Sequence, residues 1–347
     1  MKRRMTRREV LRWMALAAAG TLAACQDVTE QTAAAVEPTA APTQTTAPSA
    51  TPQPTSTPEP KLPAVYMTTA ISAAALLAMY ETLGVKAHGN VAVKISSGEP
   101  GGNYYLHPEL IEPLVKAVNG TIVECNTAYG GRRDSTESHR KAIEDHGFNA
   151  IAPTDIMDAE GVMTLPIAGG THLKEDEVGA HLANYDFVIN LAHFKGHMMA
   201  GFGGVLKNMS IGIASSQGKS LIHSAGRSRF GIGSGTPQDH FLESMAEAAK
   251  GVADYLGANI VYINVMNNLS VDCDCDNSPA KPTMADIGIL ASLDPVALDQ
   301  ACVDLVYAAP DGKDLIARME SKHGIRILEH GEAIGLGSRK YELISVD

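Results

Sequence analysis

Residues 26–62 limit where this chain can fold. They contain seven prolines and no glycine, and the rest is mainly Thr, Ala and Gln without hydrophobic periodicity. Such a segment buries too little apolar surface to offset the entropy of ordering, so we expect a disordered stalk, extended at roughly 3 Å per residue. It is either a spacer through a cell wall or a tolerated low-complexity insert. A fold must come from 63–347, about 285 residues, enough for one large domain or two lobes.

Residues 1–25 have the pattern of a bacterial export signal. Residues 6–12 resemble the twin-arginine signal, and the apolar run 13–24 is too short to span a bilayer. The run ends in Leu-Ala-Ala-Cys, which is similar to a lipobox and implies acylation of Cys25. We therefore expect a lipoprotein anchored to the extracytoplasmic face of the cell membrane; the alternatives are an uncleaved anchor and plain secretion. Twin-arginine substrates typically cross folded, often with a cofactor inserted.

The net charge and the amino-acid composition of the chain argue against some classes of binding partner. The net charge is -11 although the leader is basic, and aromatic residues make up 5% of the chain. An acidic surface repels phosphate backbones, so we expect no nucleic-acid partner. The few aromatic residues also argue weakly against a surface that stacks on bases or sugars.

In 63–347, short apolar runs alternate with helical patterns. We expect strands at 91–95, 121–125, 186–191, 260–265 and 287–291, and helices at 70–83, 108–118, 135–146, 174–183, 238–256 and 296–308. Asp294 and Pro295 form a typical cap and first turn for the last helix. This alternation predicts an α/β fold with a mainly parallel sheet and helices on both faces, in one body or two lobes. Sites in such sheets form at the carboxyl ends of strands.

The richest candidate site follows the strand at 186–191. His193 and His197 are four residues apart, which in a helical turn would place both imidazoles on one face, as metal ligands or as an acid–base pair. Glycines nearby permit close approach of the backbone to an anion that a lysine could also bind. We select as candidates Gly201, Gly203, Gly204, Lys195, Lys207 and His223. A glycine-rich turn with incidental histidines is the alternative.

Two further loops follow predicted strands. In one, Asp272 and Asp274 alternate with Cys273 and Cys275, and thiolates with carboxylates suit zinc or iron. A disulfide-like or simply reduced loop is the alternative, and Cys125 and the histidines above are the candidates for missing ligands. The other loop, 126–134, contains two arginines, of which we select Arg132 as a catalytic candidate for binding a substrate carboxylate or phosphate. Pairing of these arginines with nearby acids is equally compatible with the sequence.

Several strings within residues 91–347 resemble those of a known family. They are the His-Phe-Lys-Gly-His run at 193–197, the Gly-Phe-Gly-Gly-Val-Leu-Lys-Asn run at 201–208, the Asp-Cys-Asp-Cys run at 272–275, and the segments 286–292 and 294–297. These resemble domain-of-unknown-function family 362. Many relatives are described as iron–sulfur-associated because they add a ferredoxin-like cysteine module, which these residues do not contain. The resemblance implies an iron–sulfur centre or another metal as a cofactor to consider.

A more distant resemblance links the same segment to nickel-dependent lactate racemases. His197, Gly201, Gly204, Lys207 and His223 follow the order and similar spacing of that family's motif. The resemblance implies a proton-transfer base at His197, attachment of a pincer nucleotide at Lys207 and a nickel ligand at His223. The racemases use a further histidine upstream, where this sequence has Gly-Gly-Arg-Arg at 130–133.

Three functions are compatible with these patterns. The first is a metal- or cofactor-dependent enzyme acting on a small anionic substrate, with iron, nickel or zinc as the metal. The second is an iron–sulfur or other metal-binding redox protein without turnover. The third is a solute-binding lipoprotein, which would have two lobes around a cleft. Histidine, lysine, arginine and cysteine at neighbouring strand ends favour the enzyme.

Overall fold

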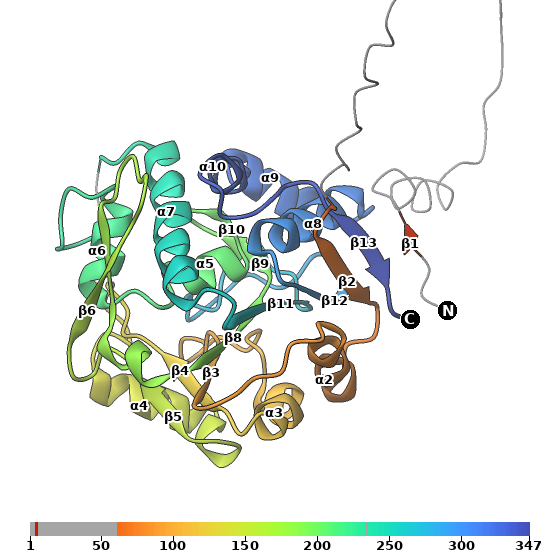
Figure 1. Ribbon diagram of the computed structural model, residues 1–347, viewed down its shortest axis with the longest axis horizontal. Coiled ribbons are helices and arrows are strands. Elements are labelled where there is room, and N and C mark those ends of the chain that lie inside the picture. The colour runs from red at the N-terminus through yellow and green to blue at the C-terminus, as the bar shows by residue number, and fades with distance from the viewer. Residues whose placement is uncertain (1–3, 6–60, 233–234) are drawn as a thin grey trace, which may run out of the picture.

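The computed structural model describes residues 4–5, 61–232 and 235–347. Cys25, the rest of the expected signal from residue 6 onward and the stalk up to residue 60 lie outside them. The central sheet contains nine strands (Figure 1). Their order across the sheet is β1 (Arg4–Met5), β13 (Glu342–Ser345), β2 (Ala64–Thr68), β12 (Gly288–Ser292), β11 (Ile260–Met266), β8 (Phe187–His193), β3 (Val91–Lys94), β4 (Thr121–Glu124) and β5 (Thr154–Ile156).

Five adjacent strands, from β11 to β5, run parallel, whereas β12 is antiparallel to both of its neighbours. All seven residues of β8 are buried. Alternate side chains of β8 point to opposite faces: Val188 and Ala192 join one hydrophobic cluster, and Ile189 and Leu191 join the other. A strand buried on both faces needs a helical layer on each. The prediction of an α/β fold with a mainly parallel sheet and helices on both faces is confirmed. The two hydrophobic clusters lie on opposite faces of the same sheet.

The two helical layers differ in their elements (Figure 1). One face is covered by α2 (Ala73–Thr82), α3 (Pro108–Ala117) and α4 (Thr136–Asp145). The other is covered by α5 (Val205–Met209), α6 (Ser216–His223), α7 (Gln238–Leu256), α8 (Pro295–Ala308), α9 (Lys313–Ser321) and α10 (Arg326–Ala333). Short 3-10 turns occur at Phe148–Ala150 and Ala180–Asn184. As predicted, α8 is capped by Asp294, whose side chain accepts from the Ala297 amide 2.8 Å away.

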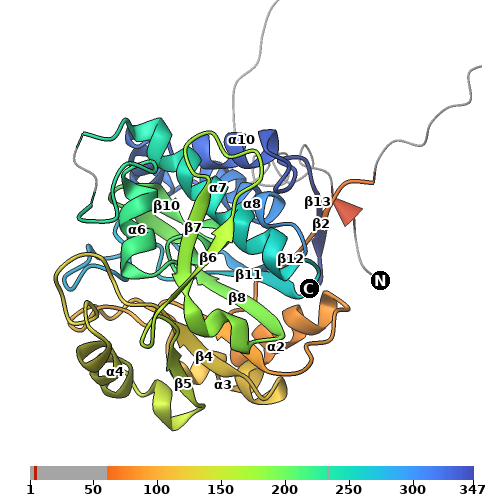
Figure 2. The same ribbon diagram turned by 60° about the vertical axis from the view of Figure 1, so that its left-hand side comes forward.

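Two sequence expectations about secondary structure are wrong. The helix expected at 174–183 is instead β7 (Glu175–Gly179) followed by a 3-10 turn, because β6 (Val162–Pro166) pairs with β7 in an antiparallel hairpin. Figure 2 shows this hairpin beside α6 and α7. The helical turn expected for His193 and His197 is also absent. His193 ends β8, and His197 ends β9 (Lys195–His197), which pairs with β10 (Gly201–Gly203).

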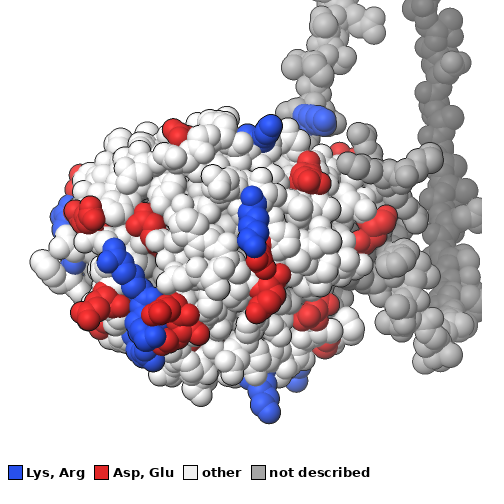
Figure 3. All heavy atoms as spheres, turned by 90° about the horizontal axis from the view of Figure 1, so that it is seen from below, with Lys and Arg blue, Asp and Glu red and all other residues white. Residues whose placement is uncertain are grey.

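Surface charges of both signs are interspersed on the face seen in Figure 3. Among the described residues, no helix has both the length and the apolar character needed to cross a bilayer.

A buried carboxylate fixes the start of α5. Asp299 of α8 accepts from the amides of Val205 and Leu206, each 3.0 Å away, and from the side-chain amide of Asn264 at 2.7 Å. These two helix-terminal N–H groups have no partner within the helix. Burial raises the pKa of Asp299 to about 6 against these hydrogen bonds. Asp299 thus connects α8, β11 and the segment that carries Lys207.

We predict that Asp299→Ala lowers the free energy of unfolding by roughly 2–4 kcal/mol, because each orphaned buried donor costs about 1–3 kcal/mol. Urea denaturation followed by circular dichroism measures the loss. The exposed Asp314, in the first turn of α9, supplies the control Asp314→Ala. Equal losses in the two variants would contradict the role of Asp299.

The same carboxyl gives a pH dependence of stability. Its folded-state pKa of about 6 lies above the ordinary value of 3.8, so the folded protein binds more protons between these values. The stability that it contributes is complete below pH 4 and is lost as pH rises through 6. The profile of Asp299→Asn is expected to be flatter in this window.

Candidate functional site

A cavity of about 250 Å³ lies at the carboxyl ends of the parallel strands. It is bounded by the ends of β3, β4 and β8 and by α5 and α6. Lys94, Glu124 and His193 are the last residues of their strands and all line it. Because parallel strands end at one sheet edge, residues distant in sequence meet here. The cavity also brings together His197, Lys207 and His223, the three residues of the racemase-like motif that carry functional groups.

One wall is a buried network of charges. The Glu124 carboxylate lies 3.1 Å from the Lys94 ammonium and 3.4 Å from Nη1 of Arg133. Arg133 also contacts Glu99 at 3.0 Å, and Asn208 of α5 accepts from Lys94 at 3.2 Å. Burial alone would raise the pKa of Glu124, but Lys94 and Arg133 outweigh it and lower the pKa to about 2. Glu124 is therefore an anion that neutralises cations and is not a proton donor at neutral pH.

His193 and Lys195 share one carboxylate. Nδ1 of His193 lies 3.0 Å from Asp274, and its Nε2 lies 2.6 Å from the carbonyl of Asn267. Lys195 contacts the other oxygen of Asp274 at 2.5 Å. Burial would raise the pKa of Asp274, but Lys195 and His193 lower it well below its usual range. Both ring nitrogens of His193 are engaged, so this predicted catalytic residue has no free nitrogen for a substrate.

Lys207 differs from its cationic neighbours because no described residue makes a hydrogen bond or ion pair with its amine. Burial lowers its pKa to about 7, helped by the nearby charge of Lys195 and opposed by Asp274. A large share of Lys207 side chains is therefore unprotonated near neutral pH, unlike an exposed lysine. An unprotonated lysine amine is a nucleophile.

The two remaining histidines present complementary atoms. Nδ1 of His223 donates to the Lys219 carbonyl at 2.7 Å, which leaves a lone pair on Nε2. Nδ1 of His197 accepts from the amides of Met199 at 3.3 Å and Ala200 at 2.9 Å, which places the ring hydrogen on Nε2. Burial lowers the pKa of both, to about 4 for His223 and well below the usual value for His197. Neutral His223 accepts a proton, and neutral His197 donates a hydrogen bond.

The three predicted cofactor-binding glycines differ in their position relative to the cavity. Gly201 has φ +82° and does not line the cavity, and a Cβ there would lie 3.1 Å from the backbones of Met319 and Gly324. A Cβ at Gly204 would lie 2.3 Å from the carboxylate of Asp299. Gly203 lines the cavity, and a Cβ there would lie 3.1 Å from the Lys207 side chain. Of the predicted cofactor-binding glycines, Gly203 and Gly204 reach the cavity.

Arg132, the arginine selected from the sequence, does not line the cavity. Its guanidinium lies 3.2 Å from Asp145 on the surface. Arg133, the next residue, is buried and lines the cavity instead. Three charged residues that line the cavity are not among the candidates selected from the sequence, namely Lys94, Glu124 and Lys219. The available signal was a charged residue at the end of a buried strand, as for Lys94 and Glu124.

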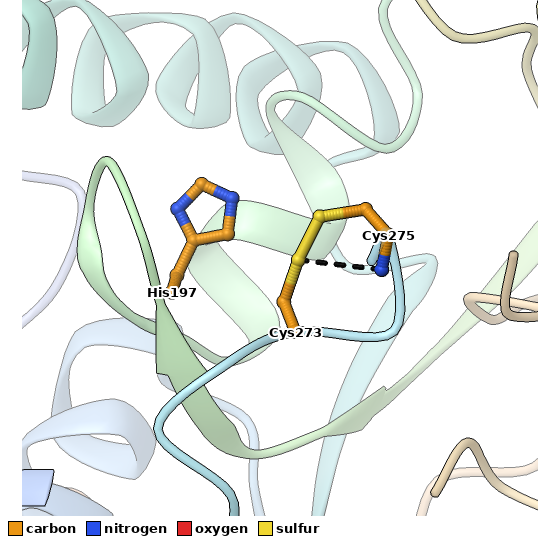
Figure 4. A group of neighbouring side chains, drawn as sticks. All are labelled: His197, Cys273 and Cys275. Atoms are coloured by element: carbon orange, nitrogen blue, oxygen red, sulfur yellow. Dashed lines mark hydrogen bonds between the residues drawn. A yellow bond between two sulfur atoms is a disulfide. The ribbon is translucent and has the colours of Figure 1, made fainter. Parts of the chain in front are cut away.

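The cysteine loop closes another side of the site. Cys273 and Cys275 form a disulfide, and Cys125 and Cys302 are free and buried. Figure 4 shows the imidazole of His197 turned toward the disulfide, with the nitrogen farther from the chain, Nε2, facing the sulfurs. The ligand atoms of these three residues lie within 4.8 Å of one another, so they could hold a metal ion once the pair is reduced. His223 is outside this group.

The donor set for a metal is nevertheless incomplete. Asp274 is held by His193 and Lys195, and Asp272 lies 3.1 Å from Arg318. Neither carboxylate is free for a cation. Binding through Nε2 of His197 would require its hydrogen to move to Nδ1, which faces two amide N–H groups. Two sulfurs alone do not complete a tetrahedral site.

A second cluster of histidines lies outside the cavity. The ring centroids of His172 and His240 lie 4.6 Å apart with the rings tilted by 32°, and the ring centroid of His330 lies 6.5 Å from that of His172. His172 contacts Glu243 at 2.5 Å, and His330 contacts Glu247 at 2.9 Å. His240 of α7 and His330 of α10 thus belong to one group with His172. Their separation in sequence gave no signal of this contact.

We predict that Lys207 reacts with acetic anhydride with a pH midpoint near 7, because its pKa is about 7. The exposed Lys313 is the reference lysine in the same sample. Peptide mass spectrometry after brief labelling at a series of pH values measures both rates in one sample. Identical pH profiles for Lys207 and Lys313 would contradict the prediction.

Comparison with known proteins places the chain. The family described as "Domain of unknown function (DUF362)" matches residues 91–304. Among solved structures, the lactate racemase apoprotein from Thermoanaerobacterium thermosaccharolyticum is 15% identical with a TM-score of 0.35, over 59% of this chain and 51% of that one. A Thermotoga maritima protein is 12% identical with a TM-score of 0.39, over 75% and 58%.

The present chain thus spans about half the length of the racemase. Likeness at these TM-scores supports no argument about activity. None of the curated proteins matches the sequence. The family match covers more than half of the chain and includes every lysine and histidine of the cavity, and the protein belongs to the DUF362 family.

Proposed function

We propose that this protein is a cofactor-dependent enzyme that binds a small anionic substrate in the cavity and uses Lys207 as its nucleophile or point of cofactor attachment. The observation that carries the proposal is the free Lys207 amine, whose pKa is lowered to about 7, beside two neutral imidazoles. Lysines in an ordinary ion-pair network keep their protons. A buried amine without a partner is typical of a reactive site.

The charges of the cavity support an anionic ligand. Its cationic lining residues are Lys94, Arg133, Lys195, Lys207 and Lys219, and Glu124 is the one carboxylate among its described lining residues. Glu124 and Glu99 neutralise Lys94 and Arg133, and Asp274 neutralises Lys195. Lys207 and Lys219 are the lining cations that no carboxylate of the described residues pairs with. A carboxylate or phosphate entering the cavity would meet this uncompensated positive charge in a partly desolvated space, where it acts more strongly than in water.

The three free groups fit distinct roles. The Lys207 amine can attack a carbonyl carbon, Nε2 of His223 can take up the proton that the amine releases, and Nε2–H of His197 can donate to the developing oxyanion. The resemblance to nickel-dependent lactate racemases suggests instead that a nucleotide cofactor is attached at Lys207 and a metal is bound at His223. Such a cofactor would supply hydride chemistry on a 2-hydroxy acid.

A redox protein without turnover is the second candidate, and the proximity of Cys273, Cys275 and His197 favours it. The third candidate, a solute-binding protein, receives less support because it predicts a cleft between two lobes. The cavity lies instead at the edge of a single sheet.

At about pH 6, where most Lys207 amines carry a proton because the pKa is about 7, we expect Lys207→Met to weaken the binding of small carboxylates by tenfold or more. A charge-assisted hydrogen bond contributes about 1.5–3 kcal/mol. Isothermal titration calorimetry with a panel of 2-hydroxy acids, 2-oxo acids and phosphate measures the effect. Lys116→Met, at an exposed lysine paired with Glu112, is the matched control. Equal affinities in both variants would remove Lys207 from the site.

The metal and the covalent adduct that the native protein carries distinguish the candidate functions. The full chain, purified after export in its own type of cell, is examined by intact mass, peptide mapping and elemental analysis. A covalent adduct on Lys207 with stoichiometric nickel supports the racemase-like form of the enzyme. Iron with acid-labile sulfide supports the redox protein, and protein without metal or adduct removes cofactor dependence.

We also propose that the enzyme is a lipoprotein held to the membrane by acylated Cys25, with its cavity on the extracytoplasmic side. The twin-arginine and lipobox patterns of 6–25 support this location. Cys25→Ser is expected to release the protein from the membrane fraction, whereas Cys302→Ser, at a buried cysteine, leaves it there. Fractionation followed by immunoblotting measures the difference, and membrane retention of Cys25→Ser would exclude the lipid anchor.

A further inference from the structure

The Cys273–Cys275 disulfide lies between two cavities. Cys275 lines the main cavity and also a second recess of about 190 Å³, whereas Cys273 lines only the recess. Cys273 is buried, with 3% of its surface exposed, and Cys275 is half-buried. A thiol in the recess would therefore reach the sulfur of Cys275 before that of Cys273.

The loop around the disulfide, residues 271–276, is held independently of the S–S bond. Arg318 binds the Asp272 side chain and the Val271 carbonyl, at 3.1 and 2.9 Å. The Asp274 carboxylate is fixed by His193 and Lys195, and its carbonyl accepts from the Glu99 amide. Opening the disulfide consequently removes one covalent bond from a loop that keeps its anchors.

Cys273 is placed to leave as a thiolate. The backbone amide of Cys275 donates to Sγ of Cys273 at 3.3 Å, as the dashed line in Figure 4 shows. Nε2–H of His197 faces the same sulfur pair. Hydrogen bonds to sulfur stabilise the thiolate and make it a better leaving group. Since Nδ1 of His197 already accepts two amides, the imidazole keeps this donor hydrogen.

We propose that Cys273 and Cys275 form a thiol–disulfide exchange site that reacts with an external dithiol through Cys275 and controls the shape of the main cavity. A partner thiolate attacks Sγ of Cys275, the Cys273–Cys275 bond breaks, and a mixed disulfide forms as Cys273 leaves as a thiolate. The second partner thiolate attacks the partner's sulfur in the mixed disulfide and releases Cys275. The partner is oxidised to its disulfide, two electrons pass to the cysteine pair, and two protons complete the two thiols.

Reduction would change the main cavity because separated thiols occupy more space than a bonded pair. Cys273 is enclosed, so the Cys275 side chain has to move, and this side chain forms part of the cavity wall. That consequence for ligand binding rests on the proposed function. The exchange reaction itself does not.

Alkylation with iodoacetamide, followed by peptide mapping of the folded full-length chain, tests the exchange. Without reductant, Cys273 and Cys275 are expected to remain unlabelled. After dithiothreitol both are labelled, Cys275 faster, while buried Cys302, which does not line the cavity, serves as the internal control and reacts only in urea. Labelling of the pair without reductant, or only after urea, would overturn the proposal.

Two variants test the order of attack. Cys273→Ser retains the accessible sulfur and should form a mixed disulfide with 5,5′-dithiobis(2-nitrobenzoate) at least tenfold faster than Cys275→Ser, which retains the enclosed one. Equal rates would contradict attack at Cys275. Should either variant fail to fold, the labelling order in the wild-type chain answers the same question.

Zinc distinguishes exchange from metal binding. Micromolar Zn²⁺ is added to the reduced protein before alkylation. Unchanged labelling supports an exchange site, whereas stoichiometric protection of both cysteines would replace it with a metal site.

The reactivity of Lys207 toward acetic anhydride, compared between the oxidised and reduced proteins, tests control of the cavity. We expect at least a threefold difference. Equal reactivity would remove that control and leave the exchange result unaffected, so the two failures can be told apart.

Discussion

The pairing of buried charges at the ends of the parallel strands determines the rest of the site. Glu124 pairs with Lys94 and Arg133, and Asp274 pairs with Lys195 and accepts a hydrogen bond from His193. Removing one partner from such a buried pair typically costs about 3–5 kcal/mol, because a charge is left without compensation. Neither carboxylate is therefore available as a partner for Lys207. Lys207, beside them, pairs with no anion among the described residues, and its pKa falls to about 7 because the free amine is the less costly buried form.

Much of the fold was accessible from sequence. Five predicted strands and the capped helix α8 were found because buried parallel strands appear as continuous apolar runs and Asp294-Pro295 is a local signal. The segment 174–183 failed because β7 gains its hydrogen bonds from β6, a partner that local periodicity does not reveal. Its tertiary pairing overrode an apparently helical spacing.

The candidate site was found less completely than the fold. His197, Lys207, His223 and the Cys273–Cys275 loop do line one connected region. However, the choice between Arg132 and Arg133 depends on one residue of register in a loop, and the loss of His193 as a free base depends on Asp274, which is 81 residues away. The importance of Gly204 likewise comes from Asp299, a residue of another helix. Contacts between residues so far apart in the chain produce no motif of characteristic spacing in the sequence.

The opposite tautomers of the two histidines follow from backbone atoms rather than from other titrating groups. His223 is held by a carbonyl and His197 by two amides, so one exposes a lone pair and the other an N–H. Protonation of His197 at Nδ1 would set a third N–H against two existing donors, and burial adds to this cost. Protonation of His223 at Nε2 is opposed by burial and by the charge of Lys207. Near neutral pH and without a ligand, both rings therefore stay neutral, and Lys207 is the group of this trio that titrates in this range.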